Sequence, residues 1–388
     1  MLQKSPVRAA APDIDWRLLA PLLANSVIVQ ATIGILRVTT SYRTLELGLP
    51  VVWLGVISAS FALLPVFCAV ALGRFIDRGN DSQAAWIGTA LMLLAAVGFW
   101  AWSPTGFHLL AFTVVLGFAH MFCMAAHQMV AVRSARLPGR EVAFGHFMVA
   151  ASTGQGLGPF VVGWLGGTST VPATGELFGV GVVAAVLSLA VALALRPAPR
   201  PLGRATEGPP VAVSTLVRMP GMFAVITASV VTVTALDLLV IYLPAIGAER
   251  HIDARDIGAL LAIRAFAALG RRQLTLASLT VAAAAFLALA LPSLPAMYLA
   301  VVAIGLGLGI ASTTTFSSIV DLAPAAARGT ALSLRITGNR VGQVLMPFLA
   351  SLIAAAIGTA GILLVVGLSL AGSGASIRMS GQRTGSSE

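Results

Sequence analysis

Long apolar stretches separated by short polar gaps follow one another along almost the whole chain. In the first half they lie near residues 16–38, 51–72, 84–103, 107–132, 142–165 and 177–195. In the second half they lie near residues 221–247, 256–270, 274–291, 296–320, 329–357 and 359–375. Most are about 20 residues long, which is the length a helix needs to cross the hydrocarbon core. Because a span must satisfy its own backbone hydrogen bonds, and no period-two alternation is present, the pattern predicts an all-α polytopic membrane protein with about twelve transmembrane helices.

A short motif indicates that these helices form two similar sets. The pattern Gly-Gln-x-Leu-x-Pro-Phe begins at Gly154 and again at Gly342, 188 residues later. Arg140 and Arg328 have the same spacing. An offset close to half of the 388-residue chain predicts two six-helix bundles that follow one another in the same order. We expect these bundles, and the cytoplasmic linker between them, at residues 1–195, 221–388 and 196–220 respectively.

The two predicted bundles differ in length near the eighth span. Gly55 and its counterpart by local pattern, Gly258, are 203 residues apart, whereas the later markers are 188 apart, so the second half lacks 15 residues. The loss falls near residues 268–272. The remaining eighth span would reach only about 20 Å against roughly 30 Å of hydrocarbon. The sequence therefore predicts a shortened eighth helix that is tilted or re-entrant.

Composition agrees with a membrane protein and removes one competing interpretation. The chain is 58% hydrophobic and only 10% charged, with a mean hydropathy of +0.94, whereas soluble domains carry about 25% charged residues. The net charge of +10 comes from arginines concentrated in alternate gaps, a pattern typical of cytoplasmic loops and not of a nucleic-acid interface. We therefore expect a multi-pass protein of the cytoplasmic (inner) membrane with both termini cytoplasmic and no nucleic-acid partner. The two cysteines lie in apolar runs and indicate no disulfide framework.

Two local motifs resemble those of the major facilitator superfamily. The loop after the second span has the pattern G-x-x-x-D-R at Gly73, Asp77 and Arg78, although Gly-Asn-Asp-Ser replaces the basic continuation. The fifth span resembles the antiporter motif of that family at four positions: Gly154, Gly158, Pro159 and Gly163. Together with twelve spans in two repeats, the resemblance covers nearly the whole chain. It implies the facilitator fold and, through the second motif, export of a substrate.

Each motif also has a physical interpretation. Gly73 would permit close approach of helices at the turn, and Asp77 could cap or pair with a helix end across the cytoplasmic face. Small residues in the fifth span allow close helix packing, and Pro159 removes one backbone hydrogen bond. Tight packing alone is the alternative to a role in export.

Charged residues inside the spans are the strongest candidates for a site, because they are costly in lipid. Helix rise places Arg340 about 18 Å and Asp237 about 24 Å from the cytoplasmic starts of their helices, and Arg264 about 12 Å below the outer face. These three side chains could reach similar levels. One interpretation is a structural salt bridge. The other is an arginine site for an anionic substrate, with Asp237 as competing partner or proton carrier.

Four further polar residues are candidates with alternatives left open. Gln155 and Gln343 are related by the repeat, and either line a cavity from both halves or join helices by hydrogen bonds. His120 lies mid-span and either titrates or is a neutral, hydrogen-bonded core residue. Arg37 lies near the outer end of the first span, from which its side chain can reach water by snorkelling.

These features predict a secondary transporter of a small organic molecule, working by proton-coupled export and alternating access. The excess of cationic groups in the spans hints at an anionic substrate. The chain has no P-loop, and neither H-E-x-x-H nor G-x-S-x-G, so an ATP-driven pump and hydrolases of those two types are disfavoured. We expect a monomer that is not an enzyme and has no cofactor or metal. The alternatives are a transport-inactive truncated homologue and a membrane-embedded enzyme.

Overall fold

The computed structural model describes residues 14–136, 139–195, 213–266, 275–289, 291, 293–323 and 328–385. Within these ranges the regular elements are all α-helices, apart from one isolated β-bridge between Ile14 and Ala135. The first half of the chain forms α1 (Trp16–Glu46), α2 (Val52–Asp77), α3 (Asp81–Ala101), α4 (Gly106–Arg133), α5 (Arg140–Gly166) and α6 (Thr174–Leu193). The second half forms α8 (Met222–Glu249), α9 (Ala254–Phe266), α10 (Thr275–Ala288), α11 (Leu294–Leu322), α12 (Arg328–Ile357) and α13 (Thr359–Gly385). A five-residue helix, α7 (Val213–Val217), precedes α8.

The twelve longer helices coincide with the twelve predicted spans, so the predicted all-helical fold is confirmed. Seven of them, within the described residues, are long and apolar enough to cross a membrane. One difference is in α1, which continues eight residues beyond the predicted end at residue 38. Its last turns are polar but buried, because Thr40 and Thr44 donate hydrogen bonds to backbone carbonyls one turn back, at 2.6 and 2.8 Å. Hydroxyl groups satisfied in this way do not end a helix.

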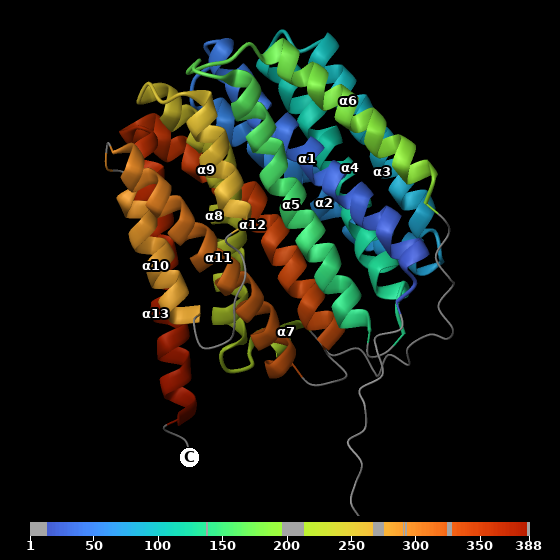
Figure 1. The fold of residues 1–388 in the computed structure, drawn as a ribbon. Coiled ribbons are helices and arrows are strands. Elements are labelled where there is room, and N and C mark those ends of the chain that lie inside the picture. Colours follow the sequence, from blue (N-terminus) through green and yellow to red (C-terminus); the bar gives the residue numbers. More distant parts are fainter. Residues whose placement is uncertain are drawn as a thin grey trace, which may run out of the picture.

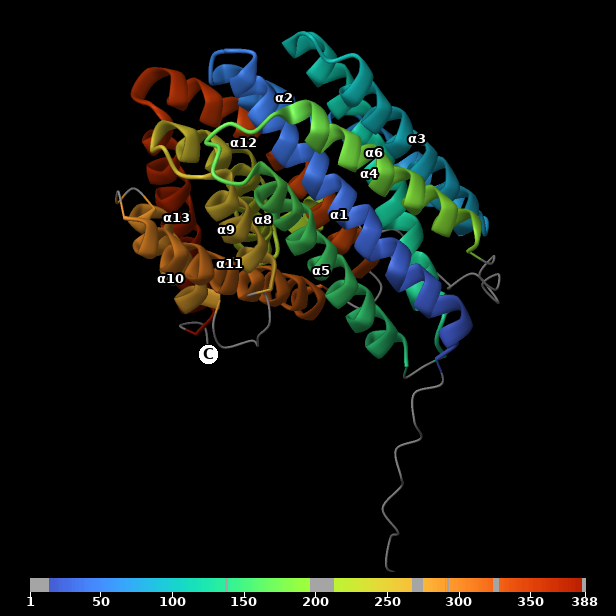
Figure 2. The same ribbon diagram turned by 45° about the horizontal axis from the view of Figure 1, so that its top comes forward.

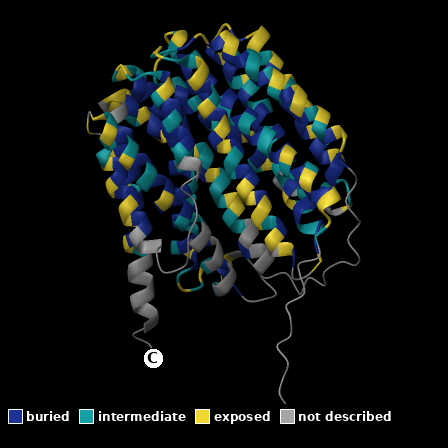
Figure 3. Cartoon of the chain, viewed as in Figure 1, coloured by how far each residue is buried: buried dark blue, intermediate teal, exposed yellow. Residues whose placement is uncertain are grey.

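Helices of each half pack mainly against one another, and the two groups lie side by side (Figures 1 and 2). Between the groups, α5 contacts α9, α2 contacts α12, and α1 contacts α8. Large apolar side chains such as Phe107, Trp164 and Leu299 are exposed on the outside of the bundle, where exposed positions recur along many helices (Figure 3). Such a surface suits lipid rather than water.

The described part of the eighth helix is short, as predicted. Helix α9 has 13 residues where its counterpart α2 has 26, and α10 has 14 where α3 has 21. The C-terminal end of α9 and the N-terminal end of α10 adjoin residues 267–274, which lie outside the described part of the chain, so these two lengths count described residues only. The expected tilted or re-entrant path stays a prediction.

For the description below, the inner end of the bundle is the end where α1 begins and α4 ends, and the outer end is the opposite one. The contacts α2–α12 and α5–α9 both lie toward the outer end. At the first, Gly55 is so close to α12 that a Cβ atom would lie 2.2 Å from the carbonyl oxygen of Pro347. At the second, a Cβ on Gly258 would lie 2.5 Å from the carbonyl oxygen of Pro159. Both contacts therefore require glycine.

Candidate functional site

A cavity of about 510 Å³ lies between the two groups of helices. It is lined by residues of both halves, from α1, α2, α4, α5, α8, α11 and α12. Its walls extend from Arg37 and Asp237 to Gly73 and Gln128, which lie near the inner ends of α2 and α4. The cavity thus reaches from the middle of the bundle toward the inner end, while the glycine contacts described above hold the outer ends together.

A chain of polar contacts joins the two halves at this cavity. The Nη1 atom of Arg37 in α1 lies 2.8 Å from Oδ1 of Asp237 in α8, and their side chains are only 12% and 17% exposed. Gln343 in α12 donates a hydrogen bond to the other carboxylate oxygen. Arg340, one turn earlier, donates to the side-chain oxygen of Gln343 at 3.0 Å. One guanidinium therefore pairs directly with the carboxylate in a largely buried setting, and the second is linked to it through Gln343.

The place of Arg37 differs from the expectation that it reaches water at the outer end. Its guanidinium lies 4.6 Å from the centre of the Phe61 ring and is directed at Asp237. The physical reason is the length of α1, since Arg37 lies nine residues before the end of the helix rather than at its end. The side chain of Arg264, the other predicted partner of Asp237, lies outside the described part of the chain.

His120 contributes a second polar group to the same cavity. Its Nε2 atom lies 3.0 Å from Oε1 of Gln30, whose amide nitrogen donates to the sulfur of Met124 at 3.3 Å. This geometry matches the interpretation of a hydrogen-bonded interior histidine. The position of His120 in the cavity wall nevertheless places it within reach of a bound solute.

The repeat-related glutamines both line the cavity but differ in their bonding. Gln343 is held between Arg340 and Asp237. Gln155 is exposed to the cavity, and no hydrogen bond of its side chain is seen among the described residues. Gln343 is therefore part of the charged network, whereas Gln155 is available to a solute.

Comparison with known proteins identifies the fold. The sequence pattern described as the Major Facilitator Superfamily matches residues 16–270 and 257–379. The chain belongs to this superfamily. No curated protein sequence matches this chain.

Solved structures of other superfamily transporters superpose over almost the whole chain. A bacterial homologue of the human lysosomal transporter Spinster, in an inward-facing and occupied conformation, has 15% identity and a TM-score of 0.75, covering 96% of this chain and 98% of that one. The D323A mutant of the nucleoside transporter NupG has 15% identity and a TM-score of 0.74, covering 93% and 98%. The xylose transporter XylE from E. coli, in an inward-open conformation, has 14% identity and a TM-score of 0.72, covering 93% and 95%. The predicted facilitator fold is confirmed.

In this facilitator-superfamily protein the residues of the antiporter-like motif are packing positions. A Cβ on Gly154 would lie 2.3 Å from the backbone oxygen of Val27 in α1, and a Cβ on Gly158 would lie 2.5 Å from that of Ala31. Gly163 faces α9, where its Cβ would lie 2.8 Å from Gly258. Close helix packing is therefore the role that these glycines visibly have.

The loop motif gives a different result. A Cβ added to Gly73 would meet no atom within 4 Å, so the expectation that this glycine permits close helix approach is wrong in this conformation. Gly73 lies inside α2 and lines the cavity instead. Arg78 is exposed, and the side chain of Asp77 lies outside the described part, so its proposed pairing stays a prediction.

Sequence reasoning missed an ion pair near this loop. Asp81 at the start of α3 accepts a hydrogen bond from Nη1 of Arg133 at the end of α4 at 2.8 Å, and their side chains are 1% and 9% exposed. Asp81 is part of the Gly-Asn-Asp-Ser segment that replaces the basic continuation of the family motif. This departure was the available signal that Asp81 has a role of its own.

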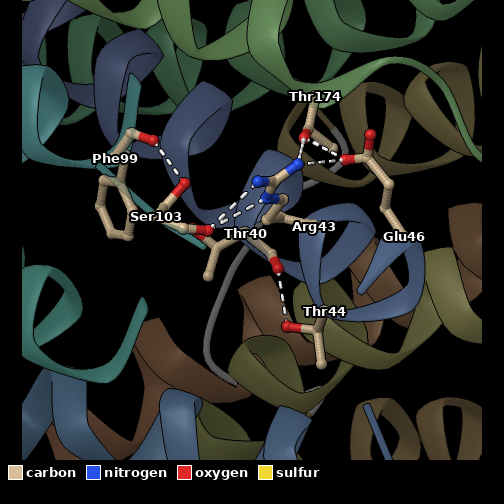
Figure 4. Close-up of polar contacts among 7 residues, drawn as sticks. All are labelled: Thr40, Arg43, Thr44, Glu46, Phe99, Ser103 and Thr174. Atoms are coloured by element: carbon tan, nitrogen blue, oxygen red, sulfur yellow. Dashed lines mark hydrogen bonds and ion pairs between the residues drawn. The ribbon is translucent and has the colours of Figure 1, made fainter. Parts of the chain in front are cut away.

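A second missed cluster lies at the outer end of the first half (Figure 4). Arg43 of α1 donates to the backbone oxygen of Ser103, just after α3, at 3.2 and 3.3 Å. It also pairs with Glu46 at 3.0 Å, and Thr174 at the start of α6 donates to the same carboxylate. These bonds join three helix ends, so Arg43 has a structural role.

Proposed function

We propose that this protein carries a small organic anion across the inner membrane by proton-coupled alternating access. The observation that supports this proposal is the Arg37–Asp237–Gln343–Arg340 network. It places more positive than negative charge in a cavity between the two halves. Two guanidinium groups and one carboxylate leave a formal charge of +1. An anionic group that enters the cavity can neutralise this charge.

The cavity suits a small organic solute in size and lining. Its volume of about 510 Å³ falls in the range of roughly 300–1,000 Å³ typical of small-molecule sites. Phe61, Met121 and Met124 offer apolar surface for the body of the solute, while Gln155 and His120 offer polar contacts. The anionic group would bind Arg37 or Arg340.

Asp237 supplies the link between the proton and the anion. While Asp237 is ionised it occupies Arg37. When it takes up a proton the ion pair is lost, and Arg37 becomes available to an anion. By linkage, the anion in turn favours protonation of Asp237. Affinity for the anion is therefore expected to rise as the pH falls.

The direction of transport has two candidates, each supported by its own observation. The resemblance of residues 154–163 to the antiporter motif favours export in exchange for protons. The Arg37–Asp237 pair favours movement of the anion together with the proton, because protonation and anion binding assist each other. The two directions are separated with vesicles that are loaded with the anion and given a pH gradient in either orientation. If the protein exchanges the anion for protons, protons entering the vesicles drive the anion out. If the two move together, protons leaving the vesicles drive the anion out.

We further propose that both termini are cytoplasmic and that the conformation described here faces the cytoplasm. The cavity then opens to the cytoplasm through the inner ends of α2 and α4, and the glycine contacts close the outer side.

Residues 1–195 and 221–388 would move as two bodies joined by residues 196–220, within a monomer. A truncated, inactive homologue is the rival suggested by the 13 residues of α9, although Gly258 keeps its contact with α5.

The test begins with the purified protein in detergent. A thermal-shift screen of small carboxylates, organic phosphates, sugars and organic cations should give stabilisation by one class of anion, increasing from pH 8 to pH 6. The stabilising anion is then used in vesicle flux measurements with and without a pH gradient.

Asp237→Asn should still bind the anion but lose the dependence on pH and the response to the gradient. Glu176→Gln is the matched control, because Glu176 is an exposed carboxylate at the start of α6, away from the cavity. A full response to the gradient in Asp237→Asn would exclude Asp237 from coupling. Flux in neither protein would support the inactive homologue, and chemical conversion without flux would support an enzyme.

A further inference from the structure

A second and much smaller cavity, of about 20 Å³, lies on the other side of Arg37 from the main cavity. It is lined by residues of α1, α2, α4 and α8, and its walls run outward along α1 as far as Thr44. Arg37 lines both cavities. Arg37 therefore lies between the main cavity and this outer pocket.

The threonines of the outer pocket present oxygen lone pairs to it. Thr40, Thr44 and Thr113 each donate their hydroxyl hydrogen to a backbone carbonyl one turn back, at 2.6, 2.8 and 2.7 Å. A hydroxyl has one hydrogen and two lone pairs. Once the hydrogen is used, the oxygen can only accept further bonds.

Ser58 of α2 lines the same pocket and differs from the threonines. Its side chain is 5% exposed, and its Oγ atom has no hydrogen-bond partner in the described part of the chain. Buried polar groups are nearly always satisfied, because desolvating one without a partner costs about 1–3 kcal/mol. The unsatisfied hydroxyl of Ser58 therefore points to a ligand.

The arrangement of donors and acceptors selects the ligand. A cation would be repelled by Arg37, and the residues lining the pocket include no carboxylate. An anion would face the lone pairs of three threonines. A water molecule can accept from Ser58 and Arg37 and donate its two hydrogens to threonine oxygens. The volume of about 20 Å³ is enough for a single water, which requires roughly 10–15 Å³ and two to four polar partners.

We propose that the outer pocket is a binding site for one water molecule, and that this water and Ser58 hold the guanidinium of Arg37 whenever Asp237 releases it. The second part rests on the proposed function, in which Asp237 is released on protonation. The water is not a path for protons, because the fixed positive charge of Arg37 repels a hydronium ion at that point. Ser58 is thus a positioning residue for Arg37.

The water is tested first, by X-ray radiolytic footprinting of the purified protein without substrate. Radicals formed from a bound water oxidise the side chains next to it. Leu54 and Ile241 line the outer pocket but not the main cavity, and they are 2% and 5% exposed. We expect both to be oxidised well above Leu22, which is fully buried elsewhere.

Displacing the water should remove this labelling. Ser58→Val fills the pocket, and Thr113→Val replaces one acceptor by a methyl group of the same size. Ser60→Ala on the same helix is the control, because the Ser60 hydroxyl donates to Ile57 at 2.6 Å and does not line the pocket. Labelling of Leu54 and Ile241 at the level of Leu22 in the wild type, or unchanged in both valine variants, would overturn the water site.

The holding role is tested by a double-mutant cycle of melting temperatures, which needs no substrate. Ser58→Ala should lower the melting temperature more in the Asp237→Asn background than in the wild type, by about 2 °C or more, because Arg37 then depends on the water and Ser58. Ser60→Ala should have the same effect in both backgrounds. An additive result for Ser58→Ala would overturn the holding role. Since both experiments are done without transport, a failure of the proposed function is seen separately.

Discussion

Where the two halves meet, they pack in the same way at two places. In the α2–α12 contact, Gly55 lies against Pro347, and in the α5–α9 contact, Gly258 lies against Pro159. Gly55 and Gly258 are counterparts in the repeat, and so are the two prolines. Even the shortening of α9 leaves its contact intact. The outer-end packing is therefore a property of the repeated unit and occurs twice.

At the cavity the two halves differ. By the same offsets, the counterpart of Asp237 in α1 is Gly34, and that of Arg340 in α5 is Ser152. The first half supplies Arg37 to the charged network, and the second half supplies the other three members. The comparison teaches that the repeat determines where helices touch, and that the candidate site is formed where the repeat is broken. The three predictions below test which features belong to the repeat and which to one half.

The largest effect on stability is expected from a feature of the first half alone, the Asp81–Arg133 ion pair. The position corresponding to Asp81 in the second half falls within residues 267–274, outside the described part of the chain. Asp81→Ala should lower the free energy of unfolding by about 3–5 kcal/mol, because it leaves a buried guanidinium without its carboxylate. Chemical denaturation in detergent measures this loss.

Two further variants make that result specific. Asp81→Leu combined with Arg133→Met should recover most of the stability, since replacing both members of a buried pair by apolar groups is often close to neutral. Glu176→Gln, at an exposed carboxylate in the same half, should have little effect. A cost below about 1 kcal/mol for Asp81→Ala would mean that the pair is effectively solvated.

The next effect is expected to be equal in the two halves. Gly55→Ala and Gly258→Ala should each destabilise by about 1–3 kcal/mol, because the new methyl group would lie 2.2 and 2.5 Å from a backbone oxygen. Gly175→Ala is the control, since a Cβ there meets no atom within 4 Å. Melting temperatures of the three variants in detergent measure the effect. A loss at Gly55 without one at Gly258 would show that the shortened α9 packs too loosely to count as an equivalent contact.

The sequence was sufficient for features that depend on local pattern. Apolar runs predicted all twelve helices, and the repeat predicted that Gln155 and Gln343 are equivalent positions, both of which line the cavity. Asp237 and Arg340 were recognised because charged residues are rare inside spans. Arg37 was recognised as a candidate but placed near the membrane surface, since buried hydroxyls carry α1 further than hydropathy indicates.

Features that depend on distant packing were beyond the sequence. Asp81 and Arg133 are 52 residues apart and meet only because α3 and α4 lie side by side. Gly73 looked like a close-contact glycine because of its motif, yet it faces the cavity. His127 bonds Asn25 at 2.8 Å and Ser26 at 3.3 Å in the interior of the first half. The spacing of seven residues between His120 and His127, two helical turns, was the available signal that they share one face of α4.

The smallest effect concerns two arginines at the outer end, where the predicted orientation disfavours positive charge. Arg43 donates to the oxygen of Ser103 after α3, and Arg250 donates to the oxygens of Leu289 and Leu291 after α10, at 2.8 and 3.0 Å. Each therefore binds backbone carbonyls just beyond the end of the third helix of its half, where no further helical turn supplies N–H donors. Arg43→Gln and Arg250→Gln should each cost about 1 kcal/mol, less than a buried charged bond because both sites are partly exposed. The pair of Arg43 with Glu46 adds little, because the two side chains are 25% and 37% exposed.

Equal losses in melting temperature for the two variants would mean that these cations are structural in both halves and carry no information on topology. If neither variant loses stability, the two arginines are ordinary surface charges and weaken the case for cytoplasmic termini.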